Sequence, residues 1–168
     1  MEYISHYTSP LGRLTLSSDG LSLTGLWFEG QKYYACTLSS GYEERVLPVF
    51  DRAAVWLDAY FSGADPGPVP PLAPRGTPFQ QAVWEVLLTI PYGKTVTYGV
   101  VAKALSERDG RTHTSARAVG GAVGRNPISV FIPCHRVIGA GGDLTGYAGG
   151  LDRKRRLLLL ERSGKPFL

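Results

Sequence analysis

Cys134 and His135 are adjacent residues whose side chains could carry out covalent chemistry. They follow the apolar run 128–132, in the segment Pro133-Cys134-His135-Arg136. A cysteine attacks as the thiolate, so a base or a positive charge must lower the pKa of its thiol. His135 and Arg136 are both close enough in sequence to do so, which makes Cys134 a candidate nucleophile and His135 its candidate base. The alternative is an inert buried thiol, the commoner state of a free cysteine.

The chemistry of this pair needs a particular geometry. Adjacent residues in an extended segment point to opposite faces. A direct hydrogen bond from Cys134 to His135 therefore needs a turn, and we expect a water molecule to relay the proton. A third group should orient the imidazole. Glu161 is the candidate, because it follows the apolar run Leu157–Leu160 and could be drawn inside; its alternative role is a solvated charge at a helix end.

The segment 115–124 reads Ser-Ala-Arg-Ala-Val-Gly-Gly-Ala-Val-Gly and predicts a helix with an almost bare surface. Glycine inside a helix is about 1 kcal/mol less favourable than alanine. Gly120 and Gly121 therefore indicate that something approaches this helix closely. One interpretation is a nucleic acid groove, with Arg117 inserted into the duplex. The other is tight packing of a second helix, with Arg117 as a surface charge, and this helix taken alone favours the packing.

The elements before residue 78 predict a scaffold. Apolar and polar side chains alternate in three stretches, which is typical of short antiparallel strands, and a helix is predicted from the spacing of apolar residues near residue 55. The predicted ranges are Tyr3–Tyr7, Leu11–Ser17 and Leu21–Phe28 for the strands and Pro48–Phe61 for the helix. Six prolines in the stretch 64–78 indicate an extended linker. We expect an α/β domain over residues 1–63, a linker over 64–77 and a second domain over 78–168.

The second domain is predicted to be mainly helical. Apolar residues from Phe79 to Ile90 recur at helical spacing, Thr97 can cap a second helix, and a polar loop, Ser106–Thr114, precedes the glycine-rich helix. The apolar run Ile128–Ile132 predicts a buried strand or extended segment. Helix, turn and helix in succession are typical of DNA-binding proteins, although the same arrangement also occurs as a plain packing unit.

The charge of the chain is unevenly distributed. Residues 1–76 contain five Lys or Arg against eight Asp or Glu, whereas residues 77–168 contain thirteen against six. A basic second domain favours a polyanionic partner, with chance as the alternative. Hydrophobic residues make up 43% and charged residues 19% of the chain, which is typical of a packed globular protein and not of a disordered one.

Several classes of protein are disfavoured by composition. The sequence lacks the run of roughly 18 apolar residues that a membrane span needs and an apolar signal-peptide core, so a cytoplasmic location and no membrane partner are expected. Cys36 and Cys134 are expected to be free thiols. The three histidines, His6, His113 and His135, do not have zinc-site spacing, so we expect neither a metal nor a cofactor.

The segment from Pro133 to Gly139, Pro-Cys-His-Arg-Val-Ile-Gly, resembles the active-site signature of the methylated-DNA–protein-cysteine methyltransferases, or 6-O-alkylguanine-DNA alkyltransferases. Five further segments resemble that family in the same order: Gly76–Gln80, Ile90–Thr95, Ala116–Gly120, Asn126–Ile128 and Gly146–Gly150. The resemblance is dense from about residue 76 to 162. Before residue 76 it is looser, with Pro10–Gly12 and Ala59–Gly63 still fitting.

The resemblance implies an N-terminal ribonuclease-H-like α/β domain with a small antiparallel sheet, and a mainly helical C-terminal domain whose helix-turn-helix enters the minor groove of double-stranded DNA. By position, Arg117 resembles the arginine finger that fills the gap left by an extruded nucleotide. Tyr98 resembles the tyrosine that assists nucleotide rotation and donates to the flipped guanine. Asn126 resembles the asparagine that braces the helix-turn-helix against the active-site turn, and Tyr147 resembles the tyrosine on the loop that covers the substrate pocket.

Further site residues follow from the same resemblance. The expected DNA contacts are Ala116, Arg117, Ala118, Gly120, Gly121, Asn126 and Arg136. The expected pocket residues are Val137, Tyr147, Ala148 and Gly149. The chain departs from the family at three places: Ala148 stands where many relatives have serine, the loop Ser106–Thr114 looks longer than in several relatives, and Cys36 lacks the cysteine cluster of relatives that repair phosphotriesters.

The resemblance implies repair by direct damage reversal. A monomer would transfer the alkyl group of a flipped 6-O-alkylguanine, with 4-O-methylthymine as a second candidate lesion, to Cys134, once and irreversibly. Three rivals remain. A Cys-His-Glu hydrolase would turn over repeatedly, a non-catalytic damage sensor would lack the reactive cysteine, and a transcription regulator would carry a richer recognition helix than Gly120-Gly121.

Overall fold

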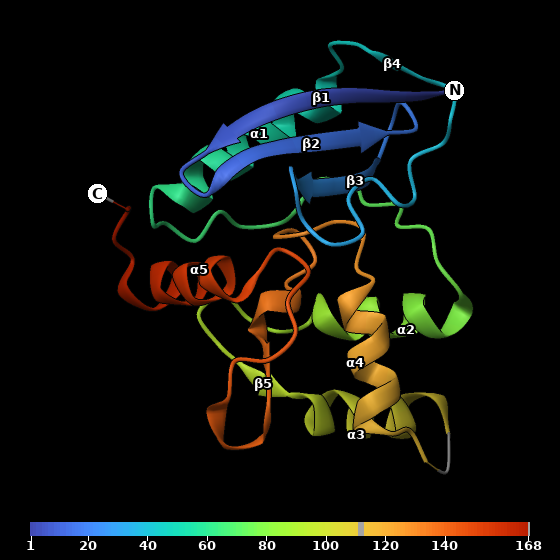
Figure 1. The fold of residues 1–168 in the computed structure, drawn as a ribbon, viewed down its shortest axis with the longest axis vertical. Helices are drawn as coiled ribbons and strands as arrows, with labels where there is room; N and C mark the ends of the chain where they lie inside the picture. The colour runs from blue at the N-terminus through green and yellow to red at the C-terminus, as the bar shows by residue number, and fades with distance from the viewer. Residues whose placement is uncertain (111–112, 168) are drawn as a thin grey trace.

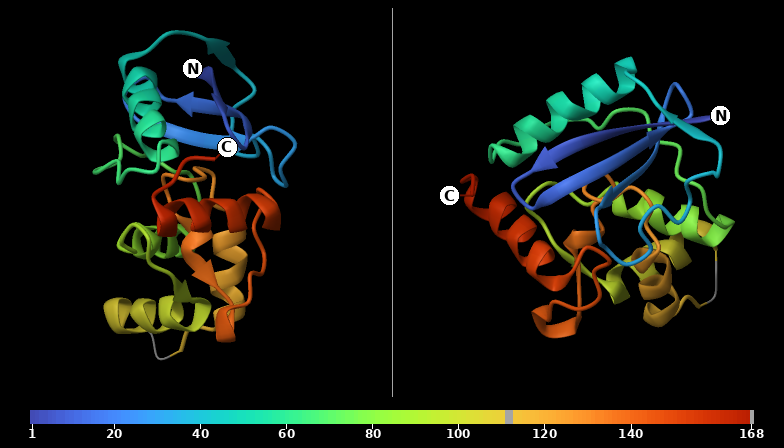
Figure 2. Two further views of the ribbon diagram at one scale, coloured as in Figure 1. Left: turned by 90° about the vertical axis from the view of Figure 1, so that its left-hand side faces the viewer. Right: turned by 45° about the horizontal axis from the view of Figure 1, so that its top comes forward.

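The structure is a computed structural model that describes residues 1–110 and 113–167. A small sheet with one helix forms the N-terminal part of the molecule, and the remaining helices form a second layer beside it (Figure 1). Two further views show the same two layers, with the last helix running alongside the sheet (Figure 2). This arrangement matches the expected α/β domain followed by a mainly helical one.

The sheet has four strands in the order β3-β2-β1-β4. Strands β1 (Glu2–Ser9), β2 (Gly12–Ser18) and β3 (Leu23–Phe28) pair antiparallel, as the alternating pattern predicted. The short strand β4 (Tyr42–Glu44) pairs parallel to β1, so the sheet is mixed and not purely antiparallel. Three residues at the sheet edge are too few to show an alternating pattern, which explains why β4 has no sequence signal.

Helix α1 (Pro48–Phe61) begins and ends at the predicted residues and lies against β1. Its apolar stripe is buried, and Tyr60 has no exposed surface. The indole of Trp56 stacks on the ring of Tyr60 with centroids 5.3 Å apart. The hydroxyl of Tyr60 is thereby directed towards the second domain, where it reaches the site described below.

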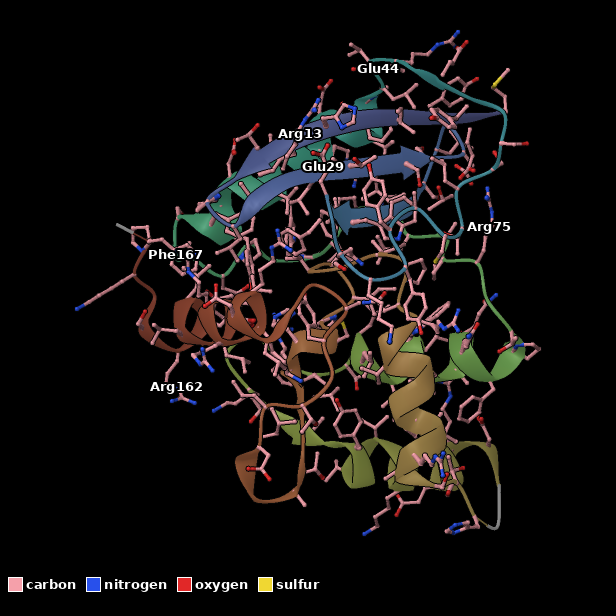
Figure 3. The ribbon with its side chains drawn as sticks, in the orientation of Figure 1. Arg13, Glu29, Glu44, Arg75, Arg162 and Phe167 are labelled. Atoms are coloured by element: carbon pink, nitrogen blue, oxygen red, sulfur yellow. The ribbon has the colours of Figure 1, made fainter. Side chains whose placement is uncertain are left out.

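The proline-rich stretch 64–77 forms no helix, but it is joined to the sheet by backbone hydrogen bonds and an ion pair. Leu23 of β3 donates its N–H to Pro71 O at 2.8 Å and accepts from Ala73 N–H at 2.8 Å. Arg75, labelled in Figure 3, pairs with the buried carboxylate of Glu2 at 3.1 Å. The segment is therefore fastened to the edge and to the first strand of the sheet.

Three helices follow, each started by a threonine or serine cap. Helix α2 (Pro78–Leu87) has a capping box, α3 (Tyr98–Asp109) follows the two-residue strand β5 (Val96–Thr97), and α4 is the glycine-rich helix (Ala116–Gly124). Thr97 and Ser115 each accept a backbone N–H three residues ahead, which satisfies a donor that the helix itself leaves unpaired. Residues 106–109, predicted as loop, are helical, and residues 111–112 of that predicted loop lie outside the described residues.

The apolar run 128–132 is a buried turn, so the prediction of a strand or extended segment there is wrong. Ile132 N–H donates to Ile128 O at 3.0 Å, and Val130 adopts a φ of 69°. Only an isolated bridge joins Ile128 to Leu26 of β3. A run of apolar residues reports burial, and burial alone does not distinguish a strand from a folded-back turn.

After this turn come the 3₁₀ helix η1 (Cys134–Arg136) and strand β6 (Val137–Ile138), which pairs parallel to β5. A second 3₁₀ turn, η2 (Ala140–Gly142), and a loop lead to α5 (Leu151–Ser163). None of the helices in the described part of the chain is long and apolar enough to cross a membrane.

Candidate active site

Cys134 is the first residue of η1 and is 4% exposed. Its N–H donates to Ile132 O at 2.8 Å, which ties the nucleophile to the preceding turn. Burial raises the pKa of the Cys134 thiol, while Asn126 and the positive charge of Lys154 oppose that rise. The cysteine therefore rests as a thiol and needs a base before it can attack.

His135 is a neutral imidazole with a defined tautomer. Its side chain has no exposed surface, and Nε2 is hydrogen-bonded to Glu161 Oε2. Because a carboxylate accepts, Nε2 carries the proton in the neutral ring and Nδ1 keeps its lone pair. Nδ1 is buried and has no hydrogen-bond partner among the described residues. Burial lowers the pKa of His135 although Glu161 opposes it, so the imidazole is neutral near pH 7.

Glu161 is drawn inside, at 6% exposure, and is held as an anion by four groups. Oε2 accepts from His135 and from the Tyr60 hydroxyl at 3.0 Å. Oε1 accepts from Arg136 Nε at 2.6 Å and from Gly93 N–H at 3.2 Å. Burial alone would raise the pKa of Glu161, but His135, Arg136 and Gly93 outweigh it and lower that pKa to about 2.

Arg136 is turned inwards. Its guanidinium pairs with Glu161 and donates to Ile90 O at 2.8 Å, and the residue is 8% exposed. This position differs from the expectation that Arg136 contacts DNA, because its donors are already committed to the interior. We therefore assign Arg136 to the network that holds Glu161.

Tyr98 and Lys154 meet at one backbone carbonyl on the loop beyond β6. The Tyr98 hydroxyl donates to Thr145 O at 3.0 Å, and Lys154 Nζ donates to the same oxygen at 2.9 Å and to Val137 O at 2.5 Å. Lys154 has no exposed surface. Sequence reasoning missed Lys154, because nothing in the run Arg153-Lys154-Arg155-Arg156 marks one basic residue as buried. It also missed Tyr60, whose hydroxyl reaches Glu161 from 101 residues away.

Asn126 braces the turn that precedes Cys134. Its Nδ2 donates to Ile132 O at 2.9 Å, and its Oδ1 accepts Ile128 N–H at 3.0 Å. The residue is buried and follows the end of α4. One side chain at the end of the glycine-rich helix thus binds the backbone of the turn before Cys134 at two points.

A cleft of about 800 Å³ opens beside these residues. Its walls come from α3, from α4, from the loop before α5 and from the N-terminal domain. The lining residues are Lys32, Tyr33, Tyr98, Ala116, Arg117, Gly120, Gly121, Gly124, Arg125, Thr145, Gly146, Tyr147 and Ala148. They include three cations and no carboxylate.

The buried residues Cys134, His135, Glu161, Asn126 and Arg136 do not line the cleft, and three further expected site residues also lie outside its wall. Ala118 is exposed on α4, and Val137 is buried behind the cleft. A Cβ on Gly149 would meet the Tyr147 ring at 2.5 Å, so this glycine makes room for Tyr147. The cleft therefore combines Tyr98 and α4 with part of the expected pocket loop.

The glycines of α4 are not required by packing against any of the residues that the structure describes. A Cβ on Gly121 or Gly124 would meet nothing within 4 Å, and one on Gly120 would meet only the Tyr98 ring, at 3.9 Å. Tight packing of a second helix is therefore not the reason for these residues. Arg117 stands on the same exposed surface.

Within residues 1–110 and 113–167, no three His, Cys, Asp or Glu side chains are grouped so that they could hold a metal ion.

The fold and the site define a two-domain protein with a buried cysteine, a candidate nucleophile, behind a helical, cationic cleft. The family model described as "6-O-methylguanine DNA methyltransferase, ribonuclease-like domain" matches residues 3–66, and the one described as "6-O-methylguanine DNA methyltransferase, DNA binding domain" matches residues 78–163. The chain belongs to the 6-O-methylguanine DNA methyltransferase family.

Individual relatives agree with this assignment. The methylated-DNA–protein-cysteine methyltransferase of Haemophilus influenzae is 44% identical over 161 residues, covering 95% of this chain and 86% of the relative. The protein of the same name from Methanosarcina acetivorans is 44% identical, covering 96% and 99%. The crystal structure of Mycobacterium tuberculosis OGT in complex with DNA matches with a TM-score of 0.85 and 45% identity, covering 98% of this chain and 95% of that one. The resemblance seen in the sequence is thereby confirmed.

Proposed function

We propose that the protein repairs DNA by transferring the alkyl group of 6-O-alkylguanine to Cys134, once per molecule. The observation that carries the proposal is the buried Cys134 beside a neutral His135 whose Nε2 is oriented by the buried Glu161. This arrangement prepares a nucleophile, and the adjacent cationic cleft gives it a polyanionic substrate. The family assignment supports the same reaction.

DNA would bind with its minor groove against α4. The bare surface around Gly120 and Gly121 lets a backbone approach closely, which a narrow groove requires. Arg117, exposed on the same helix, would enter the duplex and fill the space of the extruded nucleotide. The M. tuberculosis relative has been solved with DNA, which supports DNA as the partner.

The damaged base must leave the duplex, because an alkyl group on the 6-oxygen cannot reach a thiol inside the protein while the base remains stacked. The cleft between Tyr98 and the loop 145–148 is the place proposed for the flipped guanine. Burial raises the pKa of Tyr98, so its hydroxyl stays protonated, and it would donate to the base in place of its present hydrogen bond to Thr145 O.

The proposed reaction starts from the neutral thiol of Cys134. The thiol proton passes through a water molecule to Nδ1 of His135, and the imidazolium is stabilised by Glu161. The thiolate of Cys134 then attacks the saturated carbon, an S–C bond forms, and the C–O bond breaks with its electron pair remaining on the guanine. Hydrogen-bond donors such as Tyr98 stabilise the developing negative charge, and guanine finally takes up the proton that the thiol released.

The product is a thioether, which water does not readily hydrolyse, so the protein would act stoichiometrically. The protein would act as a monomer in the cytoplasm. Its second lesion would be 4-O-methylthymine. Repair of thymine would use the same nucleophile and base.

The test is mass spectrometry after mixing the protein with a duplex that contains one 6-O-methylguanine. We expect one added methyl group, on the peptide that contains Cys134, saturating at one per molecule and absent in Cys134→Ser. Lesion-specific binding without an adduct would instead identify a damage sensor. Neither adduct nor preference for the lesion would refute the repair function and favour the hydrolase.

A further inference from the structure

The N-terminal domain supplies part of the cationic cleft, although its sequence indicates only a scaffold. Lys32 and Tyr33 lie on the loop after β3, yet both line the cleft together with Arg117 and Arg125 of the second domain. Lys32 N–H also donates to Ala148 O at 3.1 Å. The loop after β3 is thus joined by its backbone to the wall of the proposed base pocket.

The two cations meet on one aromatic ring. The guanidinium of Arg125 lies 4.0 Å from the centre of the Tyr33 ring, and Lys32 Nζ lies 5.1 Å from it. Tyr33 has a φ of 59°, an uncommon conformation for a residue with a side chain that is often associated with a functional constraint. The ring thus contacts both Arg125, from the end of α4, and Lys32, from the other domain.

No carboxylate neutralises this pair. Among the described residues, neither Lys32 nor Arg125 takes part in an ion pair, and the cleft contains no acidic side chain. Both side chains are exposed. Two like charges brought together without a counter-ion favour an anionic ligand from solution, and a nucleic acid backbone presents such anions in a row.

We propose that Lys32 and Arg125, supported by the ring of Tyr33, form a phosphate clamp that binds the DNA backbone from the N-terminal side of the cleft. The proposal rests on the proposed function for the identity of the nucleic acid and adds a contact made by the N-terminal domain. Through the Lys32–Ala148 hydrogen bond, a phosphate held at the clamp would also fix the wall of the pocket.

The experiment compares Lys32→Gln and Arg125→Gln with the matched control Arg52→Gln, which removes one charge from α1, outside the cleft. The Kd for a lesion-containing duplex is measured by fluorescence anisotropy at several salt concentrations. Each clamp variant should raise Kd about threefold or more and reduce the slope of log Kd against log salt by about one, because one phosphate contact is lost. Arg52→Gln should change neither value.

Two further variants separate charge from structure. Lys32→Arg should retain the wild-type salt slope, and Tyr33→Ala should weaken binding because Arg125 loses its support. Thermal unfolding first confirms that the compared variants are folded, and equal salt slopes for the clamp variants and Arg52→Gln would then overturn the clamp. A wild-type protein that binds duplex with this salt dependence but never methylates Cys134 would refute the proposed function and leave the clamp standing.

Discussion

At the scale of single residues, the proposed mechanism makes Glu161 the group that determines whether His135 can act as a base. Glu161 fixes the proton on Nε2, would stabilise the imidazolium, and is itself held by Arg136 and Tyr60. Cys134, His135 and Glu161 could be predicted from the sequence because their types and neighbours suggest chemistry. The contributions of Arg136 and Tyr60 could not, because they depend on long-range approach: Tyr60 lies 101 residues from Glu161.

Glu161→Gln should slow alkyl transfer by about 100-fold, the lower end of what general-base catalysis contributes. The amide cannot stabilise the imidazolium and does not fix the proton on Nε2. Single-turnover rates with a 6-O-methylguanine duplex measure the effect, and binding of the duplex should be unchanged because Glu161 lies behind the cleft. A wild-type rate in a folded Glu161→Gln protein would show that His135 does not need the carboxylate.

The same residue should make the protein sensitive to acid. The pKa of Glu161 is lowered from 4.5 to about 2, so its contribution to stability is fully present above pH 4.5 and is lost as the pH falls towards 2. The shift corresponds to about 3 kcal/mol. Urea unfolding between pH 6 and pH 2.5 should show this loss in the wild type and a shallower one in Glu161→Gln. Parallel curves would mean that other carboxylates govern acid unfolding.

At the scale of elements, helix starts were predictable and the active-site turn was not. Thr97 and Ser115 mark helix starts through a short-range hydrogen bond that a few residues specify. The run from Ile128 to Ile132 folds into a turn because the Asn126 side chain is hydrogen-bonded to both of its ends. The apolar side chains of the run do not indicate these hydrogen bonds. Strand β4 was likewise missed, since its pairing with β1 comes from the sheet and not from its own three residues.

Gly121→Ala should separate stability from DNA binding. The added Cβ meets nothing within 4 Å, so α4 should gain about 0.5–1 kcal/mol from the better helix former. The same methyl group lies on the surface proposed to face the groove, so affinity for duplex DNA should fall, and Gly121→Leu should lower it further. Thermal unfolding and anisotropy measure the two effects. Unchanged affinity in Gly121→Leu would show that α4 does not approach DNA closely.

At the scale of the whole molecule, the active site lies on the boundary between the domains. Tyr60 belongs to the sheet domain, Gly93 follows α2, and Glu161 belongs to α5. The cleft is also lined from both domains. The division into residues 1–63, 64–77 and 78–168 remains a prediction from composition, and the site residues do not follow it, because packing brings together segments that the linker separates in sequence.

Alkylation should destabilise the entire fold. Cys134 is 4% exposed and its turn is packed, and an extra methylene in such a position typically costs about 1–3 kcal/mol. For a chain of this size, each kcal/mol lowers Tm by about 2–4 °C. Differential scanning calorimetry of the methylated and unmethylated protein measures the change. A methylated form with the same Tm would mean that the turn has room for the product.

The position of Glu161 along the chain has a consequence for biosynthesis. Glu161 follows His135 by 26 residues, on a helix that must dock before the imidazole is oriented. Synthesis proceeds from the N-terminus, and domains generally fold in that order. Under the proposed mechanism, the growing chain therefore carries Cys134 as an unassisted thiol during translation, and this thiol would become a competent nucleophile only after α5 has emerged and joined the network.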